Sequence, residues 1–394
     1  MRTILKNGCI ITPVRIIENA GIVINSGRIE ALFDSDNFEQ NKDDQVIDVH
    51  GQYISPGFID IHTHGGGGYD FMDGTVDAIV QGAKAHLAFG TTSIVPTTLT
   101  STLDELFRTL DHFQVAKDTM KEGPNLLGLH LEGPYFSMEQ KGAQDPKYIK
   151  NPDKDEYLKI LDYSNNIIRW SIAPELEGSL EMARELSRRN ILCSIAHSNA
   201  NYDEVLAGYE NGFTHITHLY SGMSTVHRKN AFRHAGVVES AYLINDMTVE
   251  IIADGVHLPE SLLKLIYKIK GADTICLVTD SMRAAGMPEG EYVLGSQSNG
   301  MKVIVEDGVA KLMDKSAFAG STATADRLLK VMTKLAEVPL LEAVKMLTIT
   351  PAKVIGVDKS KGSIVAEKDA DIVVFDKDIN ISMVFVDGSL RIQN

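Results

Sequence analysis

The amino-acid sequence predicts an α/β protein: a (β/α)8 TIM barrel with a small β-sandwich domain formed by both termini. The barrel is predicted by eight short apolar runs that alternate with helix-like segments through the middle of the chain. A doubly wound open sheet is the alternative, but no glycine-rich dinucleotide motif in a strand–turn–helix setting favours it. The runs expected to form barrel strands are residues 57–64, 90–97, 126–133, 167–175, 191–199, 213–220, 249–257 and 274–280.

The two ends of the chain have a different pattern from the middle. The first 55 residues read as short strands with turns between them, such as TILKNGCII and GIVINSGRIEAL. The last residues, from GSIVAEKDADIVVF onward, look similar. We therefore expect residues 1–55 plus 359–394 to form the small β-sandwich domain, and residues 56–358 to form the catalytic barrel.

The composition limits which partners the protein is expected to bind and in which compartment it is expected. The chain has 394 residues, 44% of them hydrophobic, and a net charge of −15. This acidic balance argues against nonspecific nucleic-acid binding and against docking on anionic membranes. The sequence shows neither a signal peptide's apolar core nor an apolar run long enough for a membrane span. The three scattered cysteines, Cys9, Cys193 and Cys276, fit a reducing compartment, so we expect a cytoplasmic protein.

The stretch GFIDIHTHGGGG places two histidines at the end of the first predicted barrel strand. Side chains alternate along a strand, so His62 and His64 share a face. Two imidazoles on one face at a strand end suit a metal ion. A hydrogen-bonded histidine pair near a turn is the alternative reading of this stretch alone.

Other predicted strands also end in polar groups. Glu132, His197, His218 and Asp280 each follow an apolar run, and the seventh run ends in Asp254 and His257. The active site of such barrels lies at the C-terminal ends of the strands, where these groups meet. Buried charged and imidazole groups are costly unless they are paired or bind a metal. Together they predict a metal centre.

The residue types indicate how this centre works. Imidazoles and carboxylates suit Zn, Fe(II) or Mn, and a carboxylate can bridge two ions. We expect His62 and His64 to hold one divalent metal, His197 and His218 a second, and Glu132 to bridge them. We expect the metal to lower the pKa of its bound water to about 7, which would make hydroxide available for attack at neutral pH. Asp280 also touches a metal, accepts the proton of this water and passes it to the leaving group.

The remaining histidines receive other roles. His215, three residues before His218, is expected to face away from the site, and His86 to pack against the barrel. His130 faces inward, either next to the metal ligands or in a packed layer below them. His257 is a candidate for substrate contact.

Taken in order, the motifs HTHG, HLEGP, AHS, THLY, ADGVHLP and TDSMRAAGMPEGEYVLG resemble the amidohydrolase superfamily. Within it, they are similar to the deacetylases of amino-sugar phosphates. The resemblance extends over nearly the whole chain and implies the barrel, the sandwich of both termini, and hydrolysis of N-acetylglucosamine 6-phosphate to glucosamine 6-phosphate and acetate. It implies that Glu132, His197 and His218 are metal ligands and that Asp280 is the catalytic acid and base. Because the chain keeps His62 and His64, it looks like the members that bind two metals.

The resemblance also implies substrate contacts, and here the chain departs from the family pattern. Ser221-Gly222 stands where the family usually has Asn-Ala, and the basic loop that follows is shifted by one position. Either Arg228 or Lys229 is expected to bind the phosphate, across the subunit interface of a homodimer. The other implied substrate contacts are Ala143, His257, Phe318, Ala319 and Gly320.

Three alternatives stay open at the level of sequence. The changed loop leaves the sugar epimer open, with N-acetylgalactosamine 6-phosphate as the other choice. Another N-acyl or cyclic amide substrate is the second alternative. A non-catalytic binding protein on the same barrel is the third, and the complete set of ligands together with Asp280 argues against it.

Overall fold

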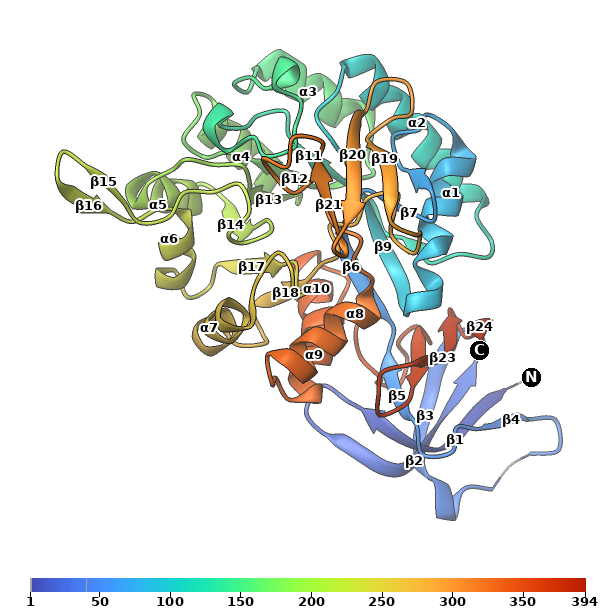
Figure 1. Cartoon of the computed structure of the whole chain (residues 1–394). Coiled ribbons are helices and arrows are strands. Elements are labelled where there is room, and N and C mark those ends of the chain that lie inside the picture. Colours follow the sequence, from blue (N-terminus) through green and yellow to red (C-terminus); the bar gives the residue numbers. More distant parts are fainter. Residues whose placement is uncertain (1, 40) are drawn as a thin grey trace.

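The computed structural model describes residues 2–39 and 41–394 and has a barrel of eight parallel strands at its centre (Figure 1). Each of the eight predicted runs matches one of these strands to within one residue or encloses it, so the predicted fold class is confirmed. The short strand β10 (Asn125–Leu126) also pairs with β9. In their order around the barrel, the strands are β6 (Phe58–Thr63), β9 (Thr91–Thr98), β11 (Leu129–Glu132), β12 (Ile167–Ile172), β13 (Leu192–Ile195), β14 (Phe213–Ile216), β17 (Thr248–Ile251) and β18 (Ile275–Leu277).

Hydrogen bonds beyond the end of β18 connect it to β6. The Asp280 N–H donates to the His62 carbonyl at 2.9 Å, and the His64 N–H donates to the Ser281 carbonyl at 2.8 Å. These bonds bring the first and last barrel strands together at their C-terminal ends. As a result, the segments that carry His62, His64 and Asp280 lie side by side.

Helices cover the outside of the barrel, and several of them begin at residues whose side chains cap the helix. The Thr75 side chain accepts a hydrogen bond from the Ala78 N–H, and Asn201 and Glu204 form a capping box. The α-helices are α1 (Val76–Ala85), α2 (Leu103–Thr119), α3 (Lys154–Tyr163), α4 (Ser179–Arg188), α5 (Tyr202–Glu210), α6 (Val237–Leu243), α7 (Glu260–Lys270), α8 (Ala325–Lys330), α9 (Leu340–Leu347) and α10 (Ile349–Val354). Shorter turns are η1 (Ser35–Asn37), η2 (Leu87–Phe89), η3 (Met138–Gln140), η4 (Pro146–Tyr148) and the π-helix η5 (Val331–Leu335).

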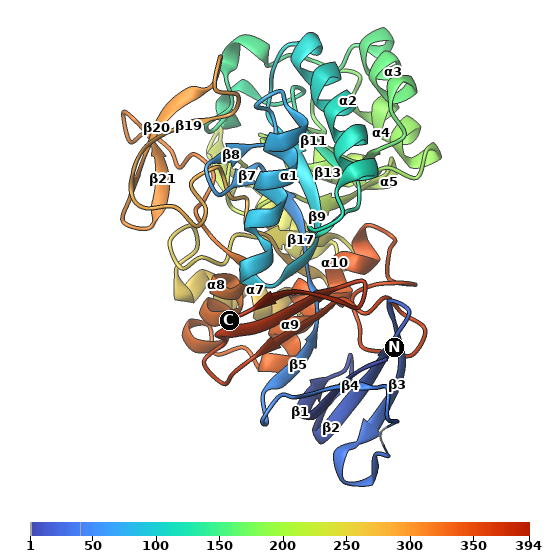
Figure 2. The ribbon, with the colours of Figure 1, turned by 90° about the vertical axis from the view of Figure 1, so that its right-hand side faces the viewer.

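Both ends of the chain build a separate sheet below the barrel, with strand order β24-β23-β22-β5-β1-β2-β3 and β4 beside β1 (Figure 2). Its two halves share one hydrophobic core, in which Ile22 and Ile54 pack with Ile372 and Phe385. This shared core is why segments from opposite ends of the chain fold together. The strands are β1 (Thr3–Ile11), β2 (Ile16–Asn25), β3 (Arg28–Asp34), β4 (Gln45–Asp48), β5 (Tyr53–Pro56), β22 (Ile372–Phe375), β23 (Ile381–Val386) and β24 (Ser389–Gln393).

Three small antiparallel sheets lie outside these two units. One follows β18 and contains β19 (Gly290–Leu294), β20 (Met301–Glu306) and β21 (Val309–Leu312). The second is a hairpin of β15 (His227–Lys229) and β16 (Phe232–His234), which projects away from the barrel in Figure 1. The third pairs β7 (Gly65–Gly66) with β8 (Tyr69–Asp70). Among the described residues, no helix is both long and apolar enough to cross a membrane.

Candidate active site

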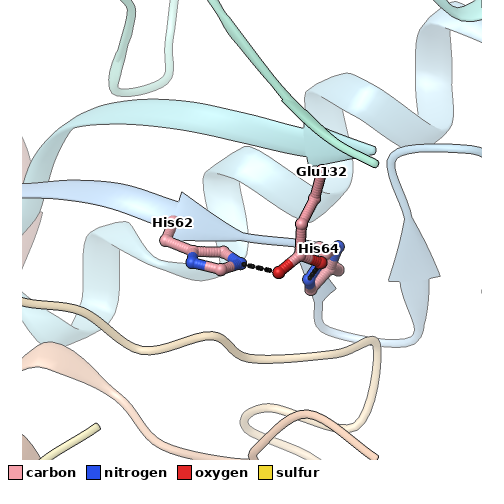
Figure 3. Close-up of side chains that lie close together, drawn as sticks. All are labelled: His62, His64 and Glu132. Carbon is pink, nitrogen blue, oxygen red and sulfur yellow. Dashed lines mark ion pairs between the residues drawn. The ribbon is translucent and has the colours of Figure 1, made fainter. Parts of the chain in front are cut away.

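Glu132 lies at the centre of a buried cluster at the C-terminal ends of the barrel strands. Figure 3 shows His62 and His64, from the end of β6, facing the Glu132 carboxylate. Each of these histidines places its Nε2 3.5 Å from a Glu132 oxygen. His197 Nε2 is 3.5 Å and His218 Nε2 is 3.0 Å from Glu132 Oε1. Four imidazoles from three strand ends thus surround one carboxylate.

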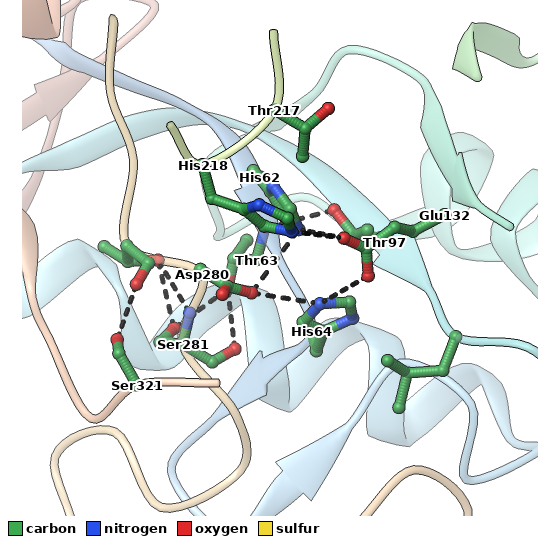
Figure 4. A network of polar contacts seen from close by, with 12 residues as sticks. His62, Thr63, His64, Thr97, Glu132, Thr217, His218, Asp280, Ser281 and Ser321 are labelled. Carbon is green, nitrogen blue, oxygen red and sulfur yellow. Dashed lines mark hydrogen bonds and ion pairs between the residues drawn. The ribbon is translucent and has the colours of Figure 1, made fainter. Parts of the chain in front are cut away.

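The cluster consists of two groups that share Glu132. His62, His64 and Glu132 place one ligand atom each within 4.8 Å of one another, and Glu132, His197 and His218 do the same. Asp280 completes the site, with Oδ1 3.1 Å from His64 Nε2 and 3.4 Å from His62 Nε2 (Figure 4). Two groups of ligands joined by one carboxylate is the arrangement that a pair of divalent ions requires.

In two of the histidines, the ring nitrogen that faces away from Glu132 has a hydrogen-bond partner, which suits metal binding through the other nitrogen. His62 Nδ1 lies 3.0 Å from Glu250 Oε2, and His197 Nδ1 lies 2.8 Å from the Gln140 carbonyl oxygen. Both partners accept hydrogen bonds, so Nδ1 carries the proton and Nε2 keeps its lone pair toward Glu132. In the described part of the chain, His62 Nε2 is buried and has no hydrogen-bond partner. These residues therefore fit a divalent metal.

The electrostatics of the cluster also favour a cation. Burial acts to raise the pKa of Glu132, but the surrounding histidines His62, His197 and His218 hold it well below its usual value. Burial likewise opposes ionisation of Asp280, while His62 and His64 lower its pKa. For His64, burial lowers the pKa, yet Asp280 and Glu132 raise it to about 9. Two carboxylates that stabilise a buried imidazolium also attract a metal ion.

Three of these residues have an unusual backbone conformation. His197, His218 and Asp280 have φ angles of 44°, 30° and 46°, a region that non-glycine residues seldom occupy. Each comes two or three residues after the end of a barrel strand, and each contributes its side chain to the cluster. Such strain persists only where the surrounding structure enforces it, and it is concentrated at functional sites.

A cavity of about 290 Å³ opens beside the cluster. His257 lies on its wall, with Nδ1 2.8 Å from Asp254 Oδ2 and its ring 4.7 Å from that of Phe318. Gln144 adds a polar group and donates to Glu132 Oε2 at 2.8 Å. Six residues expected to contact the substrate line this cavity, namely Ala143, Ser221, Gly222, His257, Phe318 and Gly320.

Three residues expected to contact the substrate do not line the cavity. Ala319 is fully buried and packs away from it, and its N–H donates to the Ala310 carbonyl. Arg228 and Lys229 lie exposed on the β15–β16 hairpin. Within one chain they do not line the cavity.

Three other histidines lie below or beside the cluster. The expectation for His215 is corrected, because its Nε2 points into the barrel and lies 3.4 Å from Glu250 Oε1. His130 lies in the layer below the metal ligands, between Thr97 and Ser171, with its ring 4.7 Å from that of His62. His86 places Nε2 3.0 Å from the Gly65 carbonyl oxygen, and burial lowers its pKa to about 4.

Sequence reasoning missed Arg169, Glu250 and Gln144. Glu250 contacts His62, and Arg169 contacts Glu250, in the barrel interior beneath the cluster. The sequence signal for Arg169 and Glu250 was that each is a charged residue inside an apolar run, IIRWSI for Arg169 and VEIIA for Glu250. The signal for Gln144 was its place directly after Ala143.

A parallel barrel with histidines and carboxylates gathered at the C-terminal ends of its strands defines a class of hydrolases. The chain belongs to this class: the model of the amidohydrolase family matches residues 53–391, so the protein is a member of that family. A relative from Lysinibacillus sphaericus, named N-acetylglucosamine-6-phosphate deacetylase, is 32% identical, with 88% of this chain and 87% of the relative covered. A relative from Escherichia coli O157:H7, named N-acetylgalactosamine-6-phosphate deacetylase, is also 32% identical, with 88% and 89% covered.

A solved structure shows the same architecture. The N-acetylglucosamine-6-phosphate deacetylase of Pasteurella multocida superposes with a TM-score of 0.92. It is 29% identical, and the comparison covers 100% of both chains. The likeness therefore includes the barrel and the sheet built from both termini.

Proposed function

We propose that the protein hydrolyses the N-acetyl group of N-acetylglucosamine 6-phosphate, giving glucosamine 6-phosphate and acetate. The observation that carries this proposal is the double cluster around Glu132 at the edge of a cavity of about 290 Å³. The names of relatives that match nearly the whole chain support the substrate.

In the proposed mechanism, His62, His64, Glu132, His197 and His218 hold the metal, and Asp280 moves the proton. A divalent ion bound here supplies a water of lowered pKa and polarises the acetyl carbonyl. Asp280 takes a proton from the attacking water, since its own pKa is held low and it is ionised at neutral pH. It then gives that proton to the departing sugar nitrogen. His257, fixed by Asp254, orients the substrate.

The proposal includes features that the sequence led us to expect. We infer two divalent ions per chain, of Zn, Fe(II) or Mn, because two ligand groups share Glu132. We also infer a cytoplasmic homodimer in which Arg228 of the partner subunit or Lys229 of the partner subunit binds the sugar phosphate. The exposed position of the hairpin supports this arrangement.

The galacto epimer is the second candidate substrate. The relative named for N-acetylgalactosamine 6-phosphate is as similar as the first relative, at 32% identity. Ser221 and Gly222, which line the cavity, stand where the family usually carries Asn-Ala. A shorter side chain on this wall changes the contacts available to the sugar hydroxyls.

Acetate release tests the proposal. We expect zinc-loaded enzyme to release acetate from N-acetylglucosamine 6-phosphate, and chelator-treated enzyme to recover activity when zinc is added back. The same assay includes the galacto epimer and unphosphorylated N-acetylglucosamine. Preference for the galacto epimer would transfer the assignment to that sugar, and equal rates without phosphate would contradict a phosphate contact. No release from any of the three would refute the substrate class.

A further inference from the structure

We propose that Glu250, held by Arg169, is a positioning residue that fixes the tautomer of His62 and so gives the His62–His64 half of the site its affinity for a divalent cation. This inference rests on the metal site of the proposed function. It does not depend on which sugar the enzyme takes.

The first step of the argument is the contact between Glu250 and His62. Both side chains are fully buried, and Glu250 Oε2 is 3.0 Å from His62 Nδ1. An ionised carboxylate only accepts hydrogen bonds, so the proton of the imidazole must lie on Nδ1. Nε2 is then free to donate its lone pair, and it points at Glu132 Oε1 (3.5 Å) and Asp280 Oδ1 (3.4 Å). Metal ions bind the unprotonated nitrogen of histidine.

The second step is the role of Arg169. Its side chain is fully buried, and Nη1 donates to Glu250 Oε1. The same guanidinium donates to the Ile61 carbonyl (3.2 Å), to Thr217 Oγ1 (2.8 Å) and to Ser194 Oγ (3.1 Å), which fixes its orientation. Since guanidinium only donates, the group facing it must be an acceptor. A carboxylate is the side chain that accepts at both ends, from Arg169 on one side and from His62 on the other.

Glu250 also supports a ligand of the other half. The His218 N–H points at Glu250 Oε2 (3.3 Å), and the Leu219 N–H donates to the Glu250 backbone carbonyl (2.8 Å). The first contact holds the backbone of His218, which has a φ of 30°. Among the described metal ligands, His62 is the one whose ring nitrogen faces the Glu250 carboxylate. Loss of its charge should therefore affect the His62–His64 half most.

The test is Glu250→Gln, which keeps the shape but offers one acceptor and one donor. Arg169 requires the amide oxygen, so the amide NH2 faces His62 Nδ1 and moves the imidazole proton to Nε2. We expect one zinc per chain to bind at least about 10-fold more weakly, as when an outer partner of a metal-binding histidine is lost, with the second retained. Zinc content and competition with a chelator measure this without reference to activity.

A second variant and a control separate positioning from general damage. In Arg169→Met/Glu250→Gln the amide can turn its oxygen to His62, so we expect zinc affinity to recover. His215→Gln is the matched control, because His215 lies 3.4 Å from Glu250 Oε1 on the side away from His62. It should bind both zinc ions as the wild type does. Wild-type zinc affinity in Glu250→Gln, or no recovery in the double variant, would overturn the proposal.

A measurement on the wild-type protein keeps the proposal testable if Glu250→Gln fails to fold around its unpaired arginine. In zinc-loaded protein with ¹⁵N-labelled histidine, we expect the His62 proton on Nδ1, assigned by comparison with His62→Gln. A proton on Nε2 of His62 would contradict the inference. If two zinc ions bind but no sugar is deacetylated, the proposed function fails while this inference stands.

Discussion

Asp280 has a proposed role in proton transfer, which kcat and zinc content together distinguish from metal binding. It lies 3.1 Å from His64 Nε2, and its low pKa leaves it ionised as a base. Asp280→Asn keeps the shape and one oxygen but cannot accept the proton of water. We expect kcat for acetate release to fall by about 10²–10⁴-fold, the usual contribution of general acid–base catalysis. The measurement is kcat at saturating substrate together with zinc content.

The control for this variant is Asp111→Asn, since Asp111 accepts a hydrogen bond from Tyr163 on the exposed surface. It should leave kcat unchanged. An Asp280→Asn enzyme that keeps full zinc content and wild-type kcat would assign the proton transfer to another group.

At the residue scale, sequence reasoning predicted the members of the cluster but not the Arg169–Glu250 pair beneath it. That His62 and His64 share a face was predicted from the alternation of side chains along a strand. Arg169 and Glu250 could not be paired from sequence, because they are 81 residues apart and both lie in runs that otherwise read as buried strands. The error at His215 came from assuming a regular strand as far as His218, whereas β14 ends at Ile216 and His218 turns back.

At the scale of elements, the loops after β11, β13 and β14 meet around one glycine. A Cβ on Gly222 would lie 2.7 Å from His197 Nδ1 and 3.0 Å from the Gln140 carbonyl oxygen. Those two atoms form the hydrogen bond that orients His197. The glycine therefore allows the three loops to pack closely enough to hold a ligand of the second metal group.

Gly222→Ala tests this packing. We expect weaker zinc binding at the His197–His218 half, measured by chelator competition, because the methyl group displaces His197 or breaks its bond to Gln140. Gly271→Ala is the matched control: Gly271 has a similar φ of 69°, against 57° for Gly222, but a Cβ there meets nothing within 4 Å. Equal zinc affinity in the two variants would attribute any effect to backbone strain rather than to the contact with His197.

Buried strands could be predicted from the sequence, whereas exposed strands could not. The eight barrel strands were predictable because each is an apolar run, and the structure places a strand in every one. The β15–β16 hairpin was not predicted as strands, because HRK and FRH are short, exposed and polar. Such segments pair through their backbone, and no apolar alternation marks them.

For the whole molecule, the joining of the terminal sheet to the barrel was predicted only in outline. Both ends were expected to form one sandwich domain, and the structure shows one sheet of eight strands from both ends with a shared core. Apolar side chains of the sheet, such as Phe375, pack against the barrel, and one buried carboxylate, Asp371, adds polar contacts at this junction. It accepts hydrogen bonds from Lys361 Nζ (2.7 Å), from the Asp387 N–H (2.9 Å) and from Asn125 of β10 (3.2 Å). No local sequence pattern shows that these residues meet.

This junction gives a prediction about the stability of the whole protein. Lys361 and Asp371 are 8% and 6% exposed, so Lys361→Met leaves a buried carboxylate without its counterion. Breaking a buried pair on one side costs about 3–5 kcal/mol, which for a chain of 394 residues lowers Tm by about 5 °C. Scanning calorimetry measures the shift, and acetate release at 25 °C should be unchanged, because neither residue lines the cavity.

Two further variants decide whether the buried charge is the cause. Lys345→Met removes a lysine that pairs at 2.9 Å with Asp273, whose side chain is 69% exposed, and it should change Tm far less. Lys361→Met/Asp371→Asn leaves no unpaired charge, so it should regain part of the lost stability. If the double variant is as unstable as Lys361→Met, the loss comes from the packing of the lysine side chain. In that case side-chain packing, and not the charge of Asp371, stabilises the contact between sheet and barrel at this point.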